Sequence, residues 1–174
     1  MTKEFTKLVK KNENDKKAYY KRLAGTITPE GLGFIKALDE MRERHLKAFI
    51  GYPNVLVRNA HTCFFDFAVS FLNGAIKKHF SKENKSFPKV VIHDKPHPSV
   101  EKDMAEQKES LTDFGYNTLK DIWYKDTPIF FALLSSLLSD KDVFVSNFMV
   151  SNYNMFLDML SFHLKQTEQK EKRA

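Results

Sequence analysis

Two long apolar segments constrain the fold of this chain more than any other feature. One covers about residues 54–80 and the other about 141–164. In the first segment, the only ionisable side chains before residue 77 are Arg58, His61, Cys63 and Asp66. A helix that is apolar on nearly all sides is normally covered by its neighbours. We therefore predict two central helices that the remainder of the chain surrounds.

Local signals predict further helices around these two. Thr28 followed by Pro29 is typical of a helix start, and Asn54 can cap the helix that follows it. Gly and Pro number six each among 174 residues, which is too few for the turns of a many-stranded β protein. We predict an all-α fold, a single domain over residues 1–174 that forms a bundle of five or six helices.

The second half of the chain begins with a connection. The segment 81–99 contains three of the six prolines and is predicted to be a long proline-rich loop. A helix is then expected from Ser99 to about Trp123. The pair Thr127–Pro128 predicts the start of another helix, and the last helix is expected at about 141–169.

The cellular compartment is predicted from the N-terminus and the cysteine content. The first residues, MTKEFTKLVKK, do not open into the apolar stretch of about 7–15 residues that a secretory signal needs. Cys63 is the single cysteine, so no internal disulfide can form. Arg58 and Asp66 would each be unfavourable inside a bilayer. We expect an intracellular, cytoplasmic protein without a membrane span.

The net charge of +6 is concentrated at the two ends of the chain. Residues 1–25 hold eight basic and three acidic side chains, and the tail 165–174 holds four basic and two acidic ones. The rest of the chain is close to neutral. Both ends are predicted to be solvated, and the polar tail is predicted to fray.

Basic side chains of this kind also bind phosphates, so nucleic-acid binding is an alternative interpretation. Two tyrosines among the N-terminal lysines could stack on bases. The same side chains could instead bind an acidic protein partner. The predicted contact residues are Lys10, Lys11, Lys16, Lys17, Tyr19, Tyr20, Lys21, Arg22, Lys77, Lys78, Lys82 and Lys85.

The histidines give little indication of a metal site. His93, Asp94 and His97 lie within five residues of one another and are all metal-ligating residue types, which makes them the one metal candidate. His45 lies on the apolar stripe of its helix and is predicted to be a core histidine with a hydrogen-bond partner. We expect neither a metal nor a cofactor.

The segment 57–68 carries a pattern of interest. Arg58, Ala60, His61 and Thr62 resemble the stretch around the phosphorylated histidine of histidine-containing phosphotransfer domains, which are also helical bundles. This resemblance implies a phosphotransfer role for His61. In that family a Lys follows three residues after the histidine and a small Gly comes next, whereas this chain has Phe64 and Phe65 there.

A structural interpretation of the same segment is a small buried polar network of Arg58, His61 and Asp66. Arg58 and Asp66 are eight residues apart, or ~12 Å along a helix, so each needs its own partner. If the preceding helix packs antiparallel, an acidic side chain of that helix could pair with Arg58. The candidates are Asp39, Glu40 and Glu43.

Three functional interpretations remain open. The first is a non-enzymatic binding or regulatory protein that engages another protein, or a second copy as a homodimer, through exposed Met and Phe side chains. The second is nucleic-acid binding, and the third is histidine phosphotransfer or metal binding. We predict the first, with no catalytic residues.

Overall fold

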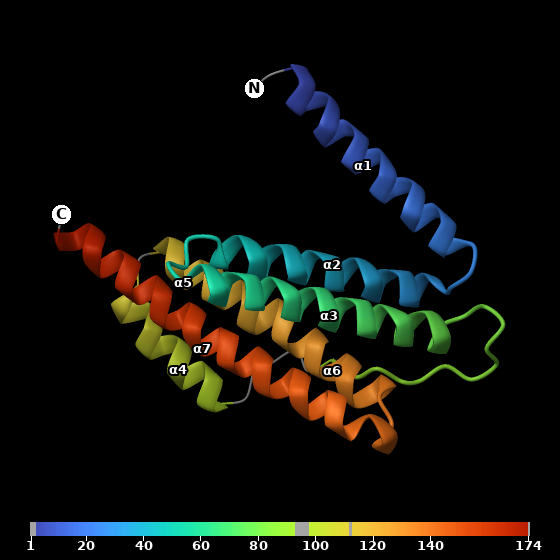
Figure 1. Ribbon diagram of the computed structural model, residues 1–174. Coiled ribbons are helices and arrows are strands. Elements are labelled where there is room, and N and C mark those ends of the chain that lie inside the picture. Colours follow the sequence, from blue (N-terminus) through green and yellow to red (C-terminus); the bar gives the residue numbers. More distant parts are fainter. Residues whose placement is uncertain (1–2, 93–97, 112, 174) are drawn as a thin grey trace.

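Helices account for most of the chain. The structure, a computed structural model, describes residues 3–92, 98–111 and 113–173. The helices pack side by side as an all-α bundle (Figure 1), which confirms the predicted fold class. They are α1 (Lys3–Ala24), α2 (Pro29–Phe49), α3 (Val55–His79), α4 (Pro98–Ser110), α5 (Asp113–Asp121), a π-helix η1 (Ile122–Asp126), α6 (Thr127–Leu137), a 3-10 turn η2 (Asp140–Asp142) and α7 (Val143–Arg173).

The hairpin of α2 and α3 begins where the sequence signals predict. The Thr28 hydroxyl accepts a hydrogen bond from the Gly31 N–H at 3.2 Å, and Pro29 takes the first helical position. The Asn54 side chain likewise accepts from the Val57 N–H at 3.2 Å. These caps satisfy backbone donors that would otherwise lack partners, so both helix starts follow from local chemistry.

The turn between α1 and α2 is pinned to the end of α3 by backbone hydrogen bonds. The Thr28 N–H donates to the Phe80 carbonyl at 2.9 Å, and the Lys82 N–H donates to the Thr26 carbonyl at 3.0 Å. This approach is so close that a Cβ added at Gly31 would lie 2.6 Å from the Phe80 Cβ. Gly31 is therefore required by the close approach of Phe80 to α2.

Replacing this glycine should destabilise the protein, whereas replacing its neighbour should not. Gly31→Ala is expected to lower the free energy of unfolding by about 1–3 kcal/mol, because Phe80 must move. Gly33→Ala is the matched control, since no atom lies within 4 Å of its added Cβ, and it should raise stability by up to about 1 kcal/mol. Urea denaturation of both variants checks this; an equal effect of the two substitutions would contradict it.

The region after residue 98 differs from the prediction. The single helix expected from Ser99 to about Trp123 is divided into α4 and α5. A helix does begin at Thr127 with Pro128 in its first turn, as predicted, but α6 follows η1 directly and no loop separates it from α5. Because Pro128 has no N–H to donate, the helix takes a wider π turn before it. In this turn the Thr127 N–H donates to the Ile122 carbonyl five residues back.

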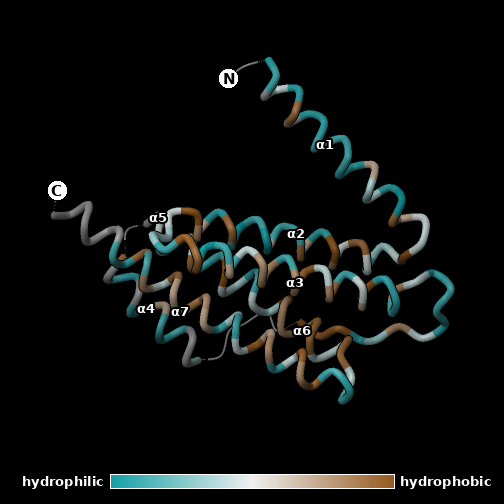
Figure 2. The backbone as a smooth tube through the Cα atoms, viewed as in Figure 1, coloured by the Kyte–Doolittle hydropathy of each residue, from teal (hydrophilic) through white to brown (hydrophobic). Residues whose placement is uncertain are grey.

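The two apolar helices also differ from the prediction in how they are covered. α3 packs against α2, α6 and α7, and it buries Phe65 and Leu72 completely, while α7 buries Tyr153 completely. The opposite sides of α3 and α7 face solvent, as the 43% exposure of Phe67 and the 53% exposure of Phe148 indicate. One reason is that the largely hydrophilic α1 leans away from the bundle and does not cover them (Figures 1 and 2).

Candidate functional site

A buried polar cluster lies where α2, η1, α6 and α7 meet. Arg44 of α2 donates from Nε to the Asp126 carboxylate at 3.1 Å. The Tyr153 hydroxyl lies 3.3 Å from Nε2 of His45 and 2.9 Å from the Thr127 hydroxyl. The π-helix turns Asp126 into the core, where it is only 1% exposed. A hydrogen-bonded group is thereby built from four separate elements.

Burial determines the protonation states in this cluster. It lowers the pKa of His45 to about 3, with smaller contributions from the neighbouring charges of His61 and Arg44, so the imidazole is neutral at pH 7. Nε2 of His45 also lies 3.7 Å from the Asp126 carboxylate, but Arg44 already compensates that charge. Burial raises the pKa of Asp126, and the Arg44 guanidinium acts in the opposite direction.

The cluster holds the fold together and does not form a reaction centre. His45, Asp126 and Tyr153 are all enclosed, and the His45 ring stacks on Phe65 at 4.5 Å between centroids. A substrate could not reach these groups without unfolding the core. The prediction that His45 is a core histidine with a partner is confirmed.

The predicted network of Arg58, His61 and Asp66 is wrong in part. His61 is buried at 2% exposure, but the Asp66 side chain is 51% exposed and pairs with Arg42 of α2. Asp66 points to the α2 side of α3, where solvent still reaches it, so the three side chains do not form one buried group.

The predicted acidic partners of Arg58 are also wrong. Arg58 donates from Nη1 to the Ile50 carbonyl at 3.3 Å. The short turn after α2 places Arg58 level with the end of that helix, beyond the reach of its acidic middle section. In that section Asp39 accepts from Tyr20, and Glu43 pairs with Lys16 of α1.

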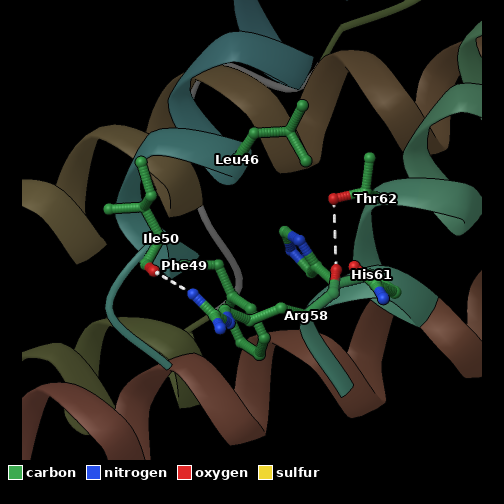
Figure 3. Close-up of a pocket in the computed structure, with 7 residues that line it drawn as sticks. Leu46, Phe49, Ile50, Arg58, His61 and Thr62 are labelled. Carbon is green, nitrogen blue, oxygen red and sulfur yellow. Dashed lines mark hydrogen bonds between the residues drawn. The ribbon is translucent and has the colours of Figure 1, made fainter. Parts of the chain in front are cut away.

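His61 lies at a pocket of about 400 Å3 between the end of α2 and the first turns of α3 (Figure 3). Its ring stacks on Phe49 at 4.1 Å and meets Phe156 edge-on at 5.0 Å. Burial lowers the pKa of His61 to about 4. A phosphotransfer histidine must be presented to the active site of a whole partner domain. His61 is reached only through the pocket, which admits a small molecule at most, and this argues against the function that its sequence pattern implies.

The predicted basic contact residues are divided between different parts of the molecule. Lys77 near the end of α3 lies beside α1, with its Nζ 5.5 Å from the Tyr19 ring centre. The C-terminus lies at the opposite end of the bundle from the connection after α3 (Figure 1). The C-terminal part of α1 and the start of the connection therefore come together, whereas the N-terminal part of α1 and the C-terminal end of α7 lie apart from them (Figure 1).

Both tyrosines that were predicted to stack on bases make contacts within the protein. The Tyr20 hydroxyl donates to Asp39 at 2.6 Å, and Lys16 and Lys36 each lie over its ring. The rings of Tyr19 and Tyr20 also contact each other. They fix the C-terminal part of α1 to α2, so stacking on a base would have to compete with these contacts.

An exposed apolar surface is formed by α3 and α7, which run antiparallel side by side (Figure 1). Phe67 and Phe148 meet edge-on at the junction, with ring centres 5.9 Å apart. We call this surface the α3/α7 face. Its exposed side chains are Leu56, Ala60, Cys63 and Phe67 of α3 and Phe144, Phe148, Met155 and Phe162 of α7.

Spacing and charge distinguish this face from the rest of the surface. Leu56, Ala60, Cys63 and Phe67 follow one another at alternating steps of four and three residues, which keeps them on one line of the helix. On α7, no Asp, Glu, Lys, Arg or His occurs from Val143 to Leu157, and the exposed Asp158 then precedes Phe162. A surface that is rich in Phe and Met and poor in charge has the composition of a protein interface core.

Residues with metal-ligating side chains do not gather in the described ranges. No group of three or more His, Cys, Asp or Glu there could hold an ion. The candidate metal residues His93, Asp94 and His97 lie outside the described residues. None of the described helices combines the length and the apolar character needed to cross a membrane.

Sequence reasoning missed both the buried cluster and the location of the exposed apolar side chains. The partners Arg44 and Asp126 are 82 residues apart, and no local pattern links them. The steps of four and three residues on α3 were a signal that could have been read. Comparisons with protein-family models, with curated proteins and with solved structures give no match, so a function must be inferred from this molecule's own surfaces.

Proposed function

We propose that this protein acts through protein–protein contacts made by the α3/α7 face, and that the partner seated on that face is a second copy of the chain. The observation that carries this proposal is the row of exposed apolar side chains along two adjacent helices, in which Asp158, between Met155 and Phe162 on α7, is the charged member. Water covers these side chains in an isolated chain, and pairing would remove them from water at ~25 cal/mol per Å2.

The total surface supports an assembled state. The chain exposes 11678 Å2, whereas a folded monomer of 20.3 kDa exposes ~8,800 Å2. Part of this excess belongs to α1, which extends away from the bundle (Figure 1). Stable homodimers bury ~2,000 Å2 or more in total, or ~1,000 Å2 on each partner, and the excess on this single chain is larger than that share.

The shapes of the two helices favour a second copy as the partner. The α3 line continues from Phe67 to Ser70 and Gly74, which have small side chains. The α7 line carries the large and highly exposed side chains Phe144 and Phe162, and we call it the ridge. A two-fold axis would place the ridge of each copy beside the small residues on α3 of the other copy, and so cover both helices at once.

The distribution of charge also favours pairing through the α3/α7 face. Two copies that each carry +6 repel one another, so they can approach closely only where charge is absent. On α3, Arg58 and Asp66 are directed toward α2 and away from the face, as their contacts with Ile50 and Arg42 indicate. The α3/α7 face is therefore a region where the repulsion between copies is small.

A charged substitution on the ridge should abolish pairing. Phe144 is 87% exposed, so Phe144→Glu leaves the fold of the single chain intact but places two carboxylates in the apolar interface of the dimer. Sedimentation equilibrium should give twice 20.3 kDa for the natural chain and a dissociation constant raised at least ~10-fold for the variant.

The matched control is Val91→Glu, an exposed apolar side chain in the connection after α3 that belongs to neither of the two helices of the face. It should dimerise like the natural chain. A natural chain that remains monomeric at ~100 µM, or equal dissociation constants for the two variants, would contradict the proposal.

Nucleic-acid binding remains an alternative with narrower support. The lysines near the end of α3 lie beside α1, which is the basic part of the chain. Lys16 and Glu43 pair there, however, and Tyr19 and Tyr20 have partners within the protein. Binding a nucleic acid would break these contacts, whereas binding through the α3/α7 face breaks none. For that reason we favour the α3/α7 face.

A further inference from the structure

The pocket at the end of α2 differs from the α3/α7 face in combining apolar walls with unsatisfied polar groups. Leu46, Phe49 and Ile50 of the α2 end form one wall, and Arg58, Asn59, His61 and Thr62 of α3 form the other (Figure 3). Its volume of about 400 Å3 lies within the range of small-molecule sites. No acidic side chain lines it.

Arg58 is the charged group of this pocket, and its charge is not compensated. Within the described ranges it forms no ion pair, and its single hydrogen bond is the one from Nη1 to the Ile50 carbonyl. Its Nε is buried and has no acceptor. A buried N–H of a guanidinium without an acceptor is unfavourable by several times RT. The Arg58 side chain as a whole is half-buried, so a rotation that turns this N–H toward an acceptor in the pocket would relieve it.

His61 adds a second polar group without a hydrogen-bond partner. The ring is 2% exposed, and its contacts in the described structure are with aromatic rings. A neutral imidazole carries one N–H donor and one acceptor nitrogen. Beside the cationic Arg58, that donor suits an anionic oxygen. Thr62 contributes no donor to the pocket, because its hydroxyl donates to the Arg58 carbonyl at 3.1 Å.

We propose that this pocket binds a small organic carboxylate with an apolar tail, with Arg58 and His61 holding the carboxylate and Leu46, Phe49 and Ile50 covering the tail. A planar carboxylate can accept two parallel hydrogen bonds from one side of a guanidinium, which Lys or a lone imidazole cannot offer. This site is independent of the α3/α7 face, because the two share no residue.

A purely structural role of Arg58 predicts something different. Arg58 also caps the C-terminal end of α2 through the Ile50 carbonyl. If capping were its whole role, its removal would alter stability without altering the binding of any ligand. A ligand-binding measurement therefore separates the two roles.

The test uses octanoate as the probe and amide chemical shifts of the full chain as the readout. Octanoate should shift resonances of residues 46–62, and of Phe156 through its contact with His61, with saturation in the range of ~0.1–1 mM, while resonances of the first two turns of α7 remain unchanged. Acetate has the charge without the tail, and octan-1-ol has the tail without the charge. Each should bind at least ~10-fold more weakly. Equal binding of either compound, or shifts that spread to the first two turns of α7, would overturn the proposal.

Variants connect the binding to named side chains. Arg58→Met should weaken octanoate binding at least ~10-fold, Arg58→Lys should weaken it to a smaller extent, and Arg22→Met on exposed α1 is the unchanged control. Ile50 is exposed, so Ile50→Ser does not threaten folding and should weaken the tail contact several-fold. Unchanged binding in Ile50→Ser or in a folded Arg58 variant would overturn the proposal.

Discussion

Acidification from pH 7 to pH 4.5 should destabilise the protein by about 2 kcal/mol for each of two buried histidines. Burial lowers the pKa of His45 to about 3 and that of His61 to about 4, below the ordinary value of 6.5. In this pH range the unfolded chain binds protons that the folded chain excludes, so stability falls as pH falls. The loss begins near pH 6.5 and ends near the folded pKa values.

Other groups near His45 are part of this balance. Asp126 faces it from η1, Tyr153 from α7 and Arg44 from its own helix, while His61 lies across the core on α3. Because burial raises the pKa of Asp126, its protonation in acid favours the folded state and offsets part of the loss. Acidification still lowers the free energy of unfolding, since the loss from two histidines is larger than the gain from one carboxylate.

His61→Phe isolates one of the two contributions. Phe keeps the stacking on Phe49 and removes the titrating group, and no hydrogen bond of His61 is lost in the described structure. Urea denaturation at pH 7 and pH 4.5 should show a difference between the two pH values that is about 2 kcal/mol smaller in the variant. The matched control is His79→Gln, at the end of α3. The same pH difference in the natural chain and His61→Phe would contradict the assignment.

The second large effect should come from the buried ion pair. Asp126→Ala removes a carboxylate that is 1% exposed and takes the ion-pair partner from Arg44, whose side chain is 34% exposed and can still reach water. Because solvent reaches the arginine, the free energy of unfolding should fall by about 2–4 kcal/mol, at or below the range for a fully buried pair. For a chain of this length the melting temperature should fall by ~10 °C.

The matched control is the ion pair of Arg42, which lies two residues before Arg44 on α2. Arg42 pairs with Asp66, whose side chain is 51% exposed, so the ion pair is surrounded by water. Asp66→Ala is expected to change stability by less than about 1 kcal/mol. Thermal and urea unfolding of the two variants give the comparison. Similar effects of Asp126→Ala and Asp66→Ala would contradict the role of burial.

Local chemistry explains which parts of the fold could be predicted from the sequence. Thr28, Pro29 and Asn54 act on backbone groups within three residues, so the starts of α2 and α3 were predictable. The π-helix was not predictable, because Thr127–Pro128 resembles an ordinary helix start. The π-helix turns Asp126 into the core, and the partner of Asp126 there is Arg44, which is 82 residues away in the sequence.

Hydropathy accounts for the incomplete prediction of α3 and α7. An apolar side chain looks the same in the sequence whether it fills a core or forms an interface. Phe65 is fully buried and Phe67 is 43% exposed, although they are two residues apart. Their environments depend on which neighbours cover the helix, and that could be known only once α1 was placed away from the bundle.

The reactivity of Cys63 gives the most direct test of the α3/α7 face as a self-association surface. Cys63 is the chain's single cysteine, is exposed in the isolated chain, and lies between Ala60 and Phe67 on the α3 line. Short pulses of a maleimide reagent would measure its modification rate at protein concentrations from ~1 to ~200 µM. Pairing predicts a rate per thiol that falls at least ~10-fold with concentration in the natural chain and stays constant in Phe144→Glu. A constant rate in the natural chain over the whole range would contradict pairing through this face.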